Sequence, residues 1–208
     1  PTQLSRQNLL KENVPDDMIS VTGNTVIDAL YWVVDKIKND QSLNDELKQI
    51  LASAGYDVNR LNEGKKLVLI TGHRRENFGE PIREICKAVL ELVENNKDIE
   101  IVYPVHPNPN VRQPVYELLD GKDRIHLIQP LEYAQFCSLM KKAHIILTDS
   151  GGVQEEAPSL GKPVLVMRDT TERPEAVDAG TVILVGTNKN KIVSETNDLL
   201  NNKERYVL

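Results

Sequence analysis

The chain has 208 residues and a formal net charge of −6. A chain of this length forms one or two domains and can bury about 70% of the surface that it exposes when unfolded. The acidic balance argues against a general nucleic-acid-binding protein, because no broad basic surface is available to neutralise phosphates.

The sequence carries no sign of secretion or of membrane insertion. We find no signal peptide and no apolar run near the length of a membrane span. The two cysteines, Cys86 and Cys137, lack metal-ligand spacing, and each lies on the apolar face of a predicted helix. We therefore expect a cytoplasmic globular protein with buried thiols, no disulfide and no metal site.

The first part of the chain predicts helices that lead into a domain. Leucines near the start fit the end of a helix that Pro15 terminates. The predicted elements that follow are a short strand at residues 18–21 and helices at 26–37 and 42–54, with Asn24 and Thr25 at a helix start and Gly55 as a stop. We expect residues 1–60 to be connecting helices and residues 61–208 to form one domain.

From Lys66 onward, short apolar runs alternate with amphipathic helical patterns. The predicted strands are 67–70, 99–103, 125–128, 144–147, 163–166 and 182–185. One predicted helix has Pro81 in its first turn, and others cover 111–119, 133–140 and 191–200. A further helix is predicted from the spacing of Val153, Ala157 and Leu160. Alternation of this kind indicates βαβ units. The expected fold class is α/β, a doubly wound parallel sheet of Rossmann-like type.

Four polar loops follow predicted strands: residues 73–77, 104–109, 150–152 and 168–174. In doubly wound sheets, ligands bind beyond the carboxyl ends of the strands. Because all four loops fall at that edge, they predict one binding site between them.

Residues 148–157 predict an anion-binding turn. Ser150, Gly151 and Gly152 can present backbone N–H groups at the start of a helix, where the helix dipole favours negative charge. Glu155 and Glu156 lie one turn further in and could accept hydrogen bonds from sugar hydroxyls. The alternative is a simple glycine turn whose acidic residues favour the helix start.

Two other loops carry charged side chains. Residues 73–76 place a histidine and two arginines beside a glutamate, and arginine forks bind phosphate or carboxylate in bidentate fashion; the alternative is a surface charge cluster with an internal Arg–Glu pair. Residues 169–175 offer hydroxyls, acids and Arg173, which could line a sugar or form an ordinary solvated loop.

Isolated aromatic and histidine residues leave several interpretations open. His106 could contact a ligand or be a hydrogen-bonded structural residue. His126 and His144 lie in strand patterns, so we expect structural roles. Phe136 fits the core, but a base could stack on it or on Tyr133.

Three long motifs resemble one known family. They are Thr71-Gly72-His73-Arg74-Arg75-Glu76-Asn77-Phe78-Gly79, Tyr103-Pro104-Val105-His106-Pro107-Asn108, and the stretch from Thr148 through Arg168-Asp169-Thr170-Thr171-Glu172-Arg173-Pro174-Glu175; residues 21–28 are similar too. The chain resembles the second half of the non-hydrolysing UDP-N-acetylglucosamine 2-epimerases. The resemblance implies one of the two Rossmann-like domains of a GT-B-type architecture, with the active site in the cleft between them.

The resemblance also implies an activity. Such enzymes interconvert UDP-GlcNAc and UDP-ManNAc, in cell-surface polysaccharide biosynthesis, without a redox cofactor or a metal. UDP is eliminated to give a glycal, and UDP then adds back with the opposite configuration at C2. The implied ligands are UDP and UDP-GlcNAc, and the implied partners are an N-terminal domain and, in a full-length protein, a second copy in a homodimer.

Individual roles follow from the same resemblance. Ser150, Gly151 and Gly152 would hold the diphosphate, and Glu156 the ribose hydroxyls. Leu131 and Phe136 would flank the uracil. His73 would be the catalytic histidine in the cleft, and Arg173 would border the sugar. Arg74 and His106 would contact a second, regulatory UDP-GlcNAc.

The sequence departs from the family pattern in one respect. The N-terminal domain, with the carboxylates thought to handle the C2 proton, is not in this sequence. We therefore expect the chain to bind UDP weakly and not to epimerise alone. The alternatives are a GT-B glycosyltransferase domain, a nonenzymatic sugar-nucleotide-binding module and a hydrolysing relative. An NAD-type Rossmann protein is disfavoured because no G-x-G-x-x-G follows the first strand.

Overall fold

The structure is a computed structural model that describes residues 1–206. The strands are β1 (Lys66–Thr71), β2 (Ile99–Pro104), β3 (Ile125–Ile128), β4 (Ile145–Thr148), β5 (Val164–Val166) and β6 (Val182–Leu184). The helices are α1 (Gln3–Lys11), α2 (Thr25–Asn39), α3 (Gln41–Ser53), α4 (Glu80–Asn95), α5 (Pro109–Leu119), α6 (Tyr133–Lys142), α7 (Val153–Ser159), α8 (Pro174–Asp178), α9 (Lys189–Asn201) and α10 (Lys203–Tyr206). Short 3₁₀ helices cover Asp16–Met18, Val58–Glu63 and Arg75–Asn77.

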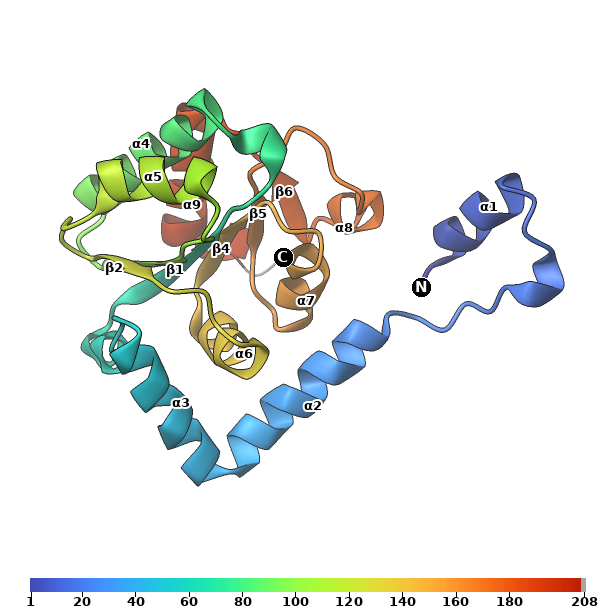
Figure 1. The fold of residues 1–208 in the computed structure, drawn as a ribbon, viewed down its shortest axis with the longest axis horizontal. Helices are drawn as coiled ribbons and strands as arrows, with labels where there is room; N and C mark the ends of the chain where they lie inside the picture. Colours follow the sequence, from blue (N-terminus) through green and yellow to red (C-terminus); the bar gives the residue numbers. More distant parts are fainter. Residues whose placement is uncertain (207–208) are drawn as a thin grey trace.

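The six strands form one parallel sheet in the order β3-β2-β1-β4-β5-β6. The order reverses between β1 and β4, which is the arrangement of a doubly wound sheet. Val68 of β1 pairs with Ile101 of β2 on one side and with Ile145 of β4 on the other. The predicted α/β, Rossmann-like fold class is confirmed (Figure 1).

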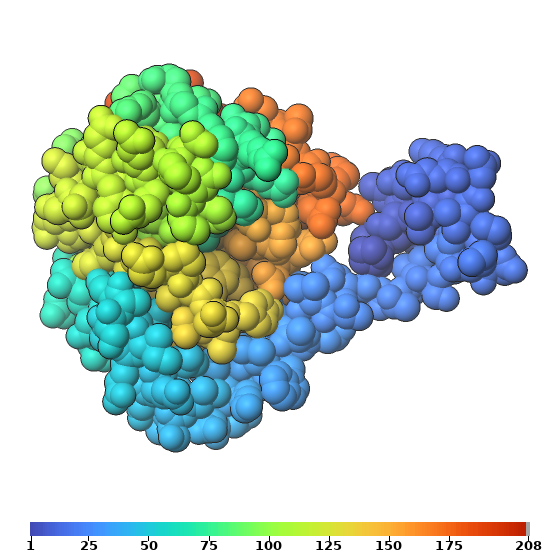
Figure 2. Space-filling model, in the orientation of Figure 1, coloured from blue at the N-terminus to red at the C-terminus, as the bar shows by residue number. Residues whose placement is uncertain are grey.

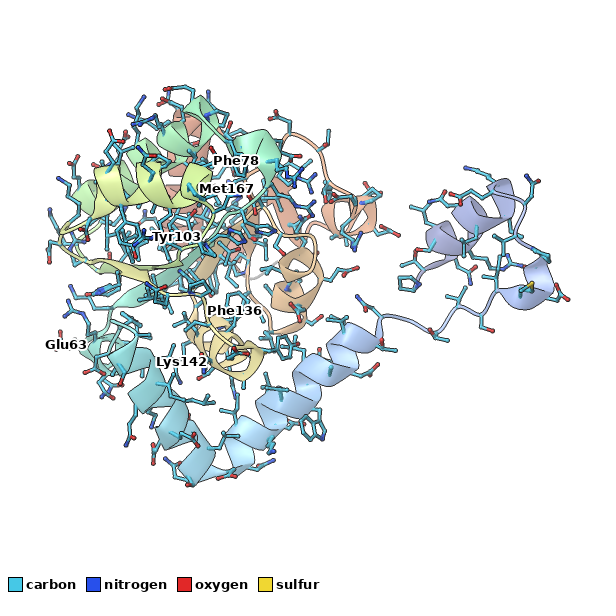
Figure 3. The ribbon with its side chains drawn as sticks, viewed as in Figure 1. Glu63, Phe78, Tyr103, Phe136, Lys142 and Met167 are labelled. Carbon is cyan, nitrogen blue, oxygen red and sulfur yellow. The ribbon has the colours of Figure 1, made fainter. Side chains whose placement is uncertain are left out.

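Helices cover both faces of the sheet, and each face has its own apolar core. Successive side chains of a strand point to opposite faces; in β1, Val68 and Ile70 enter the core beneath α4, α5 and α9, whereas Leu67 and Leu69 enter the core beneath α2, α3, α6 and α7. The apolar and aromatic side chains labelled in Figure 3 follow the same division: Phe78, Tyr103 and Met167 belong to the first core and Phe136 to the second. Strands covered on both faces explain the unbroken apolar runs in the sequence.

The two cysteines lie where the sequence predicts. Cys86 on α4 and Cys137 on α6 are buried, one in each core, and both are free thiols. Burial raises the pKa of Cys86 to about 12 and that of Cys137 to about 11. Both thiols are therefore protonated and unreactive at neutral pH.

The N-terminal segment extends away from the sheet. Helix α1 buries none of its residues, and the chain between α1 and α2 crosses open space (Figures 1 and 2). The strand predicted at residues 18–21 is wrong, because Met18 ends a 3₁₀ helix and the residues after it pair with no strand among residues 1–206. Its apolar pattern is real, but a strand needs a neighbour, and Met18 is 75% exposed.

Helices α2 and α3 pack on the domain. Leu30 and Val34 of α2 and Leu51 of α3 are buried in the core beneath α6 and α7. The chain then passes through the 3₁₀ helix at Val58–Glu63 before it enters β1. The boundary at residue 61 stays a prediction. Among the described residues, no helix is long and apolar enough to cross a membrane.

Candidate functional site

The site is built at the point where the strand order reverses. Strands β1 and β4 are neighbours there, and the loops that follow them leave the sheet side by side. Asp149 N–H donates to the Thr71 carbonyl (3.2 Å), and the hydroxyls of Thr71 and Thr148 lie 2.6 Å apart. The gap between the two diverging loops is where ligands bind in sheets of this topology.

The glycine turn after β4 is partly as the sequence predicts. Backbone N–H groups of Gly151 and Gly152 donate to no acceptor within residues 1–206, so they remain available to an anion. Ser150 differs from the prediction, because its N–H donates to Thr148 Oγ1 at 3.0 Å. Thr148 is fully buried at the strand end, and its hydroxyl closes the turn. Ser150 therefore offers its hydroxyl, not its N–H group.

Asp149 organises the loop after β1. Its carboxylate is fully buried and accepts hydrogen bonds from the backbone of His73 (2.9 Å) and of Arg74 (2.8 Å). The side-chain amide of Asn77 donates to the same carboxylate at 3.1 Å and to the Met167 carbonyl at 3.1 Å. The His73 loop is thus fixed to both β4 and β5. Neither Asp149 nor Asn77 is among the site residues proposed from the sequence.

Arg74 lies next to the glycine turn. Its Nη2 is 3.6 Å from the position that a Cβ on Gly151 would take. Glu172 approaches the same position to 3.8 Å and lies 3.6 Å from Arg74. Arginine and carboxylate therefore meet at the mouth of the turn, and a bound phosphate would compete with Glu172 for Arg74.

Arg168 holds Glu172 in that place. The Arg168 side chain is 7% exposed and donates to Glu172 and to Glu76, both at 2.5 Å. The hydrogen bond from Arg168 is the main reason that the pKa of Glu172 falls to about 2. Glu172 is therefore ionised throughout the physiological pH range. This network supports both interpretations of the polar loops, because it contains internal Arg–Glu pairs and still leaves Arg74 at the turn.

Glu156 is buried beside the turn. Its Oε1 accepts a hydrogen bond from the Tyr133 hydroxyl at 2.7 Å, and its Oε2 lies 4.0 Å from the position of a Cβ on Gly152. Burial raises the pKa of Glu156, the bond from Tyr133 opposes this, and the charge of Glu155 adds to the rise. Leu131 and Phe136 are partly buried around α6. Two adjacent segments thus supply most of the predicted site residues. The turn before α7 and its first residues carry Ser150, Gly151, Gly152 and Glu156, and the start of α6 carries Leu131 and Phe136.

The loop between β5 and α8 is fastened to α7. Thr171 donates to Gln154 (2.5 Å), and Arg173 Nε lies 2.7 Å from Glu155. These contacts bring Arg173 to the helix that follows the glycine turn. The short helix α8 begins at Pro174, directly after Arg173. It is absent from the elements predicted from the sequence, where the polar loop ends at residue 174.

The four histidines divide into two groups. His73 and His106 stack with ring centroids 5.6 Å apart, so the loops after β1 and β2 meet at the site. His126 donates to or accepts from the buried Glu100 at 2.6 Å, near the amino end of the sheet. His144 stacks on Tyr206. The structural roles expected for His126 and His144 fit these positions.

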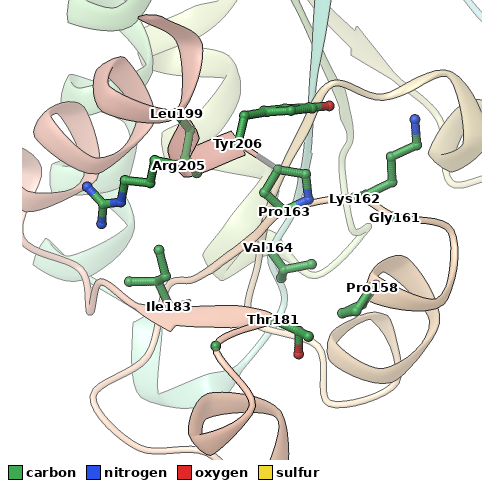
Figure 4. Close-up of a pocket in the computed structure, with 11 residues that line it drawn as sticks. Pro158, Gly161, Lys162, Pro163, Val164, Thr181, Ile183, Leu199, Arg205 and Tyr206 are labelled. Atoms are coloured by element: carbon green, nitrogen blue, oxygen red, sulfur yellow. The ribbon is translucent and has the colours of Figure 1, made fainter. Parts of the chain in front are cut away.

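A small cavity of about 50 Å³ lies at the opposite end of β5 and β6 (Figure 4). Its lining includes Lys162, Pro163, Thr181 and Tyr206. It holds little more than one or two waters. None of the polar loops reaches it, so we place the functional site at the carboxyl edge of the sheet.

Sequence reasoning missed the buried members of the site. Asp149, Asn77 and Arg168 act beneath the surface, through other side chains and through backbone groups. One signal for Asp149 was available, because an acid directly after the buried run of residues 145–148 must find donors at the strand end. No comparable signal in the sequence indicates that Arg168 is buried.

The fold and the site define a Rossmann-like α/β domain with a glycine turn at its topological switch point, where backbone N–H groups of Gly151 and Gly152 have no acceptor among residues 1–206. The described part of the chain contains no cluster of three or more histidine, cysteine or acidic residues that could hold a metal ion. A sequence model of the family described as UDP-N-acetylglucosamine 2-epimerase matches residues 1–207. The chain belongs to the UDP-N-acetylglucosamine 2-epimerase family.

Relatives agree in sequence and in structure. The chain is 56% identical over 206 residues to the UDP-N-acetylglucosamine 2-epimerase of Yersinia pestis, covering 99% of this chain and 53% of the relative. The crystal structure of UDP-GlcNAc 2-epimerase from Neisseria meningitidis bound to UDP-GlcNAc matches with a TM-score of 0.90 at 49% identity, over 99% of this chain and 53% of that one. The Methanocaldococcus jannaschii enzyme in complex with UDP-GlcNAc and UDP matches with a TM-score of 0.82 at 33% identity, over 98% and 54%.

The chain spans about half the length of the curated relatives that it matches. The matched half is their C-terminal half.

Proposed function

We propose that the chain is the UDP-binding half of an enzyme that interconverts UDP-GlcNAc and UDP-ManNAc. The proposal is supported by family membership and by two relatives whose structures contain UDP-GlcNAc. The observation that carries it is the pair of free N–H groups at Gly151 and Gly152 beside the guanidinium of Arg74, at the switch point of the sheet. A diphosphate needs this combination of backbone donors and a cation.

The ligand would lie across the β1 and β4 loops. The diphosphate contacts Gly151, Gly152, the Ser150 hydroxyl and Arg74. The ribose hydroxyls reach Glu156, and the uracil packs between Leu131 and Phe136. This arrangement places the reacting sugar toward His73 and Arg173. His106, which stacks on His73, lies where it can contact either the same ligand or a second, regulatory UDP-GlcNAc.

The reaction needs groups beyond those on this chain. Elimination removes the C2 proton and breaks the bond between C1 and the UDP oxygen; re-addition reverses both changes from the other face at C2. His73 protonates the leaving UDP oxygen, and the diphosphate-binding groups stabilise the negative charge of the departing UDP. The base and acid for the C2 proton belong to the N-terminal half of the enzyme, so the chain alone does not epimerise.

The N-terminal arm is a contact surface for that other half. Leu9, Leu10 and Met18 are exposed on an arm that projects from the domain (Figure 2). Exposed large apolar side chains on such an arm favour a protein interface. We propose that residues 1–24 pack against the N-terminal half, and that the complete enzyme forms a homodimer.

Calorimetry with the 208-residue chain tests the binding proposal. UDP should bind with a measurable heat and UMP more weakly, because UMP lacks the second phosphate. Lack of any UDP binding at millimolar concentrations would contradict the proposal.

The activity proposal has a separate test. UDP-GlcNAc incubated with the chain should remain unchanged, and addition of a polypeptide carrying the N-terminal half should produce UDP-ManNAc. Conversion at the rate of the complete enzyme by the chain alone would contradict the division of roles.

A further inference from the structure

Asp149 makes an unusual set of contacts with a single loop. Its carboxylate accepts from the backbone N–H of His73 (2.9 and 3.1 Å), the backbone N–H of Arg74 (2.8 Å) and the amide of Asn77 (3.1 Å). In addition, Asp149 Oδ1 lies 3.3 Å from Nδ1 of the His73 ring. The carboxylate therefore faces both the backbone and the side chain of the same histidine.

The donors around Asp149 identify its carboxylate as an acceptor. Three N–H groups donate to it, and between them they reach both of its oxygens. Within the part of the chain that the structure describes, His73 is the only cationic or ionisable basic side chain within 4 Å of the carboxylate. Because every hydrogen bond to this carboxylate comes from an N–H group, the ring nitrogen that faces Oδ1 fits the same set as a donor, that is, when it carries the hydrogen.

The residues around the contact between Asp149 and His73 are closely packed. A Cβ on Gly72 would lie 2.9 Å from Tyr103 Oη, so a larger residue at position 72 would displace the Tyr103 hydroxyl, and it would be in van der Waals contact with Asp149 Oδ2 at 3.7 Å. His106 stacks on the other side of the His73 ring at an interplanar angle of 25°. The His73 side chain is nevertheless 42% exposed, and among residues 1–206 the hydrogen bonds of this residue are made by its backbone N–H, which leaves Nε2 without a partner there.

We propose that Asp149 is a positioning residue that holds the neutral His73 ring in the Nδ1–H tautomer and so directs the Nε2 lone pair into the cleft. A histidine whose one nitrogen is held by a carboxylate presents the other with a defined orientation and protonation. The consequence for the reaction rests on the function proposed above: as the bond from C1 to the UDP oxygen breaks, the imidazolium gives its Nε2 proton to that oxygen, and when UDP adds back the neutral ring takes the same proton on Nε2.

Histidine nitrogen-15 spectroscopy of the 208-residue chain tests the tautomer directly. With four histidines in the chain, the ring signals can be assigned by the loss of one set in His73→Gln. At a pH where the rings are neutral, His73 should show a protonated Nδ1 and an unprotonated Nε2. In Asp149→Asn the amide can donate to Nδ1, so the two nitrogen shifts of His73 should exchange, as expected for a change to the Nε2–H tautomer.

A matched control is available at the other end of the sheet. Glu100 is also a fully buried carboxylate and lies 2.6 Å from a histidine nitrogen, that of His126. Glu100→Gln should alter the His126 signals and leave those of His73 unchanged. Its backbone spectrum also reports how much a buried carboxylate-to-amide change disturbs the fold in general.

Two outcomes would overturn the proposal. One is an Nε2–H tautomer of His73 in the unchanged chain, a result that does not depend on whether Asp149→Asn folds. The other is a folded Asp149→Asn variant whose His73 signals are the same as before. Titration with UDP separates this proposal from the proposed function. If His73 shows the Nδ1–H tautomer but its signals do not change when UDP is added, UDP binding at this site is refuted and the role of Asp149 is still supported.

Discussion

Glu156→Gln tests the ribose contact most directly. Tyr133 already occupies Oε1 of Glu156, so Oε2 is the oxygen left for a ribose hydroxyl, and it lies beside Gly152. A hydrogen bond to a charged acceptor contributes about 1.5–3 kcal/mol and a neutral one about 0.5–1.5 kcal/mol. Replacing one by the other should cost about 1–1.5 kcal/mol, which weakens UDP binding about 5- to 10-fold.

The comparison ligand makes the test specific. A UDP analogue that lacks the ribose hydroxyls should lose less than about 2-fold in affinity on the same substitution, because it has no hydroxyl to offer. Isothermal titration calorimetry measures both ligands on both proteins. Equal losses for UDP and the analogue would refute the ribose contact, whatever their size.

A change in the stability of the Glu156→Gln variant should not account for its loss of UDP affinity. Burial raises the pKa of Glu156, so the ionised carboxylate is disfavoured in the folded chain. Its favourable effect on stability is present below the unfolded pKa and is lost as pH rises through the folded pKa. At pH 7 the uncharged glutamine should therefore leave the melting temperature unchanged or higher. Glu100→Gln, at the far end of the sheet, is the control for affinity and should bind UDP normally.

Three further predictions concern the turn and the charge network. Gly151→Val should weaken UDP binding by more than about 10-fold while the melting temperature stays nearly the same, since Gly151 has no positive φ; unchanged affinity would count against the turn. The pKa of Glu172 is lowered to about 2, so its stabilising effect is present above the unfolded pKa and is lost as pH falls toward 2. In Glu172→Gln, the free energy of unfolding measured with urea should therefore fall less between neutral and acid pH than in the unchanged chain; the difference should be below about 1 kcal/mol, because the side chain is 47% exposed. Glu100→Ala should lower the free energy of unfolding by about 2–4 kcal/mol, because Arg60 and His126 lose a buried partner; a loss below about 0.5 kcal/mol would show that water replaces it.

Much of the fold was predictable from the sequence because its pattern is local. Each buried run in the second part of the chain became a strand, and each stripe of apolar residues at helical spacing became a helix on one face. The failure at residues 18–21 has a physical cause: strand formation depends on a partner that a local pattern does not reveal. The short helix α8 was missed because its five residues carry no periodicity.

The candidate site was predictable where its residues lie in polar loops that directly follow strands. Loops 73–77 and 150–152 were identified from glycine and arginine in positions that follow strands, and the structure brings them together. What the sequence could not supply is the layer beneath. Asp149 acts through backbone N–H groups on a loop 75 residues away, and such a contact leaves no trace in local composition.

The carboxylate of Asp149 also affects which parts of the molecule can open. His73 and Arg74 belong to an exposed polar loop, where backbone amides ordinarily exchange their hydrogens with solvent quickly. Here both amides donate to the buried carboxylate of Asp149, so their exchange requires that these hydrogen bonds break and that the loop leaves the end of β4. We therefore expect these two amides to exchange much more slowly than those of the other exposed loops, which would make part of the surface a protected segment.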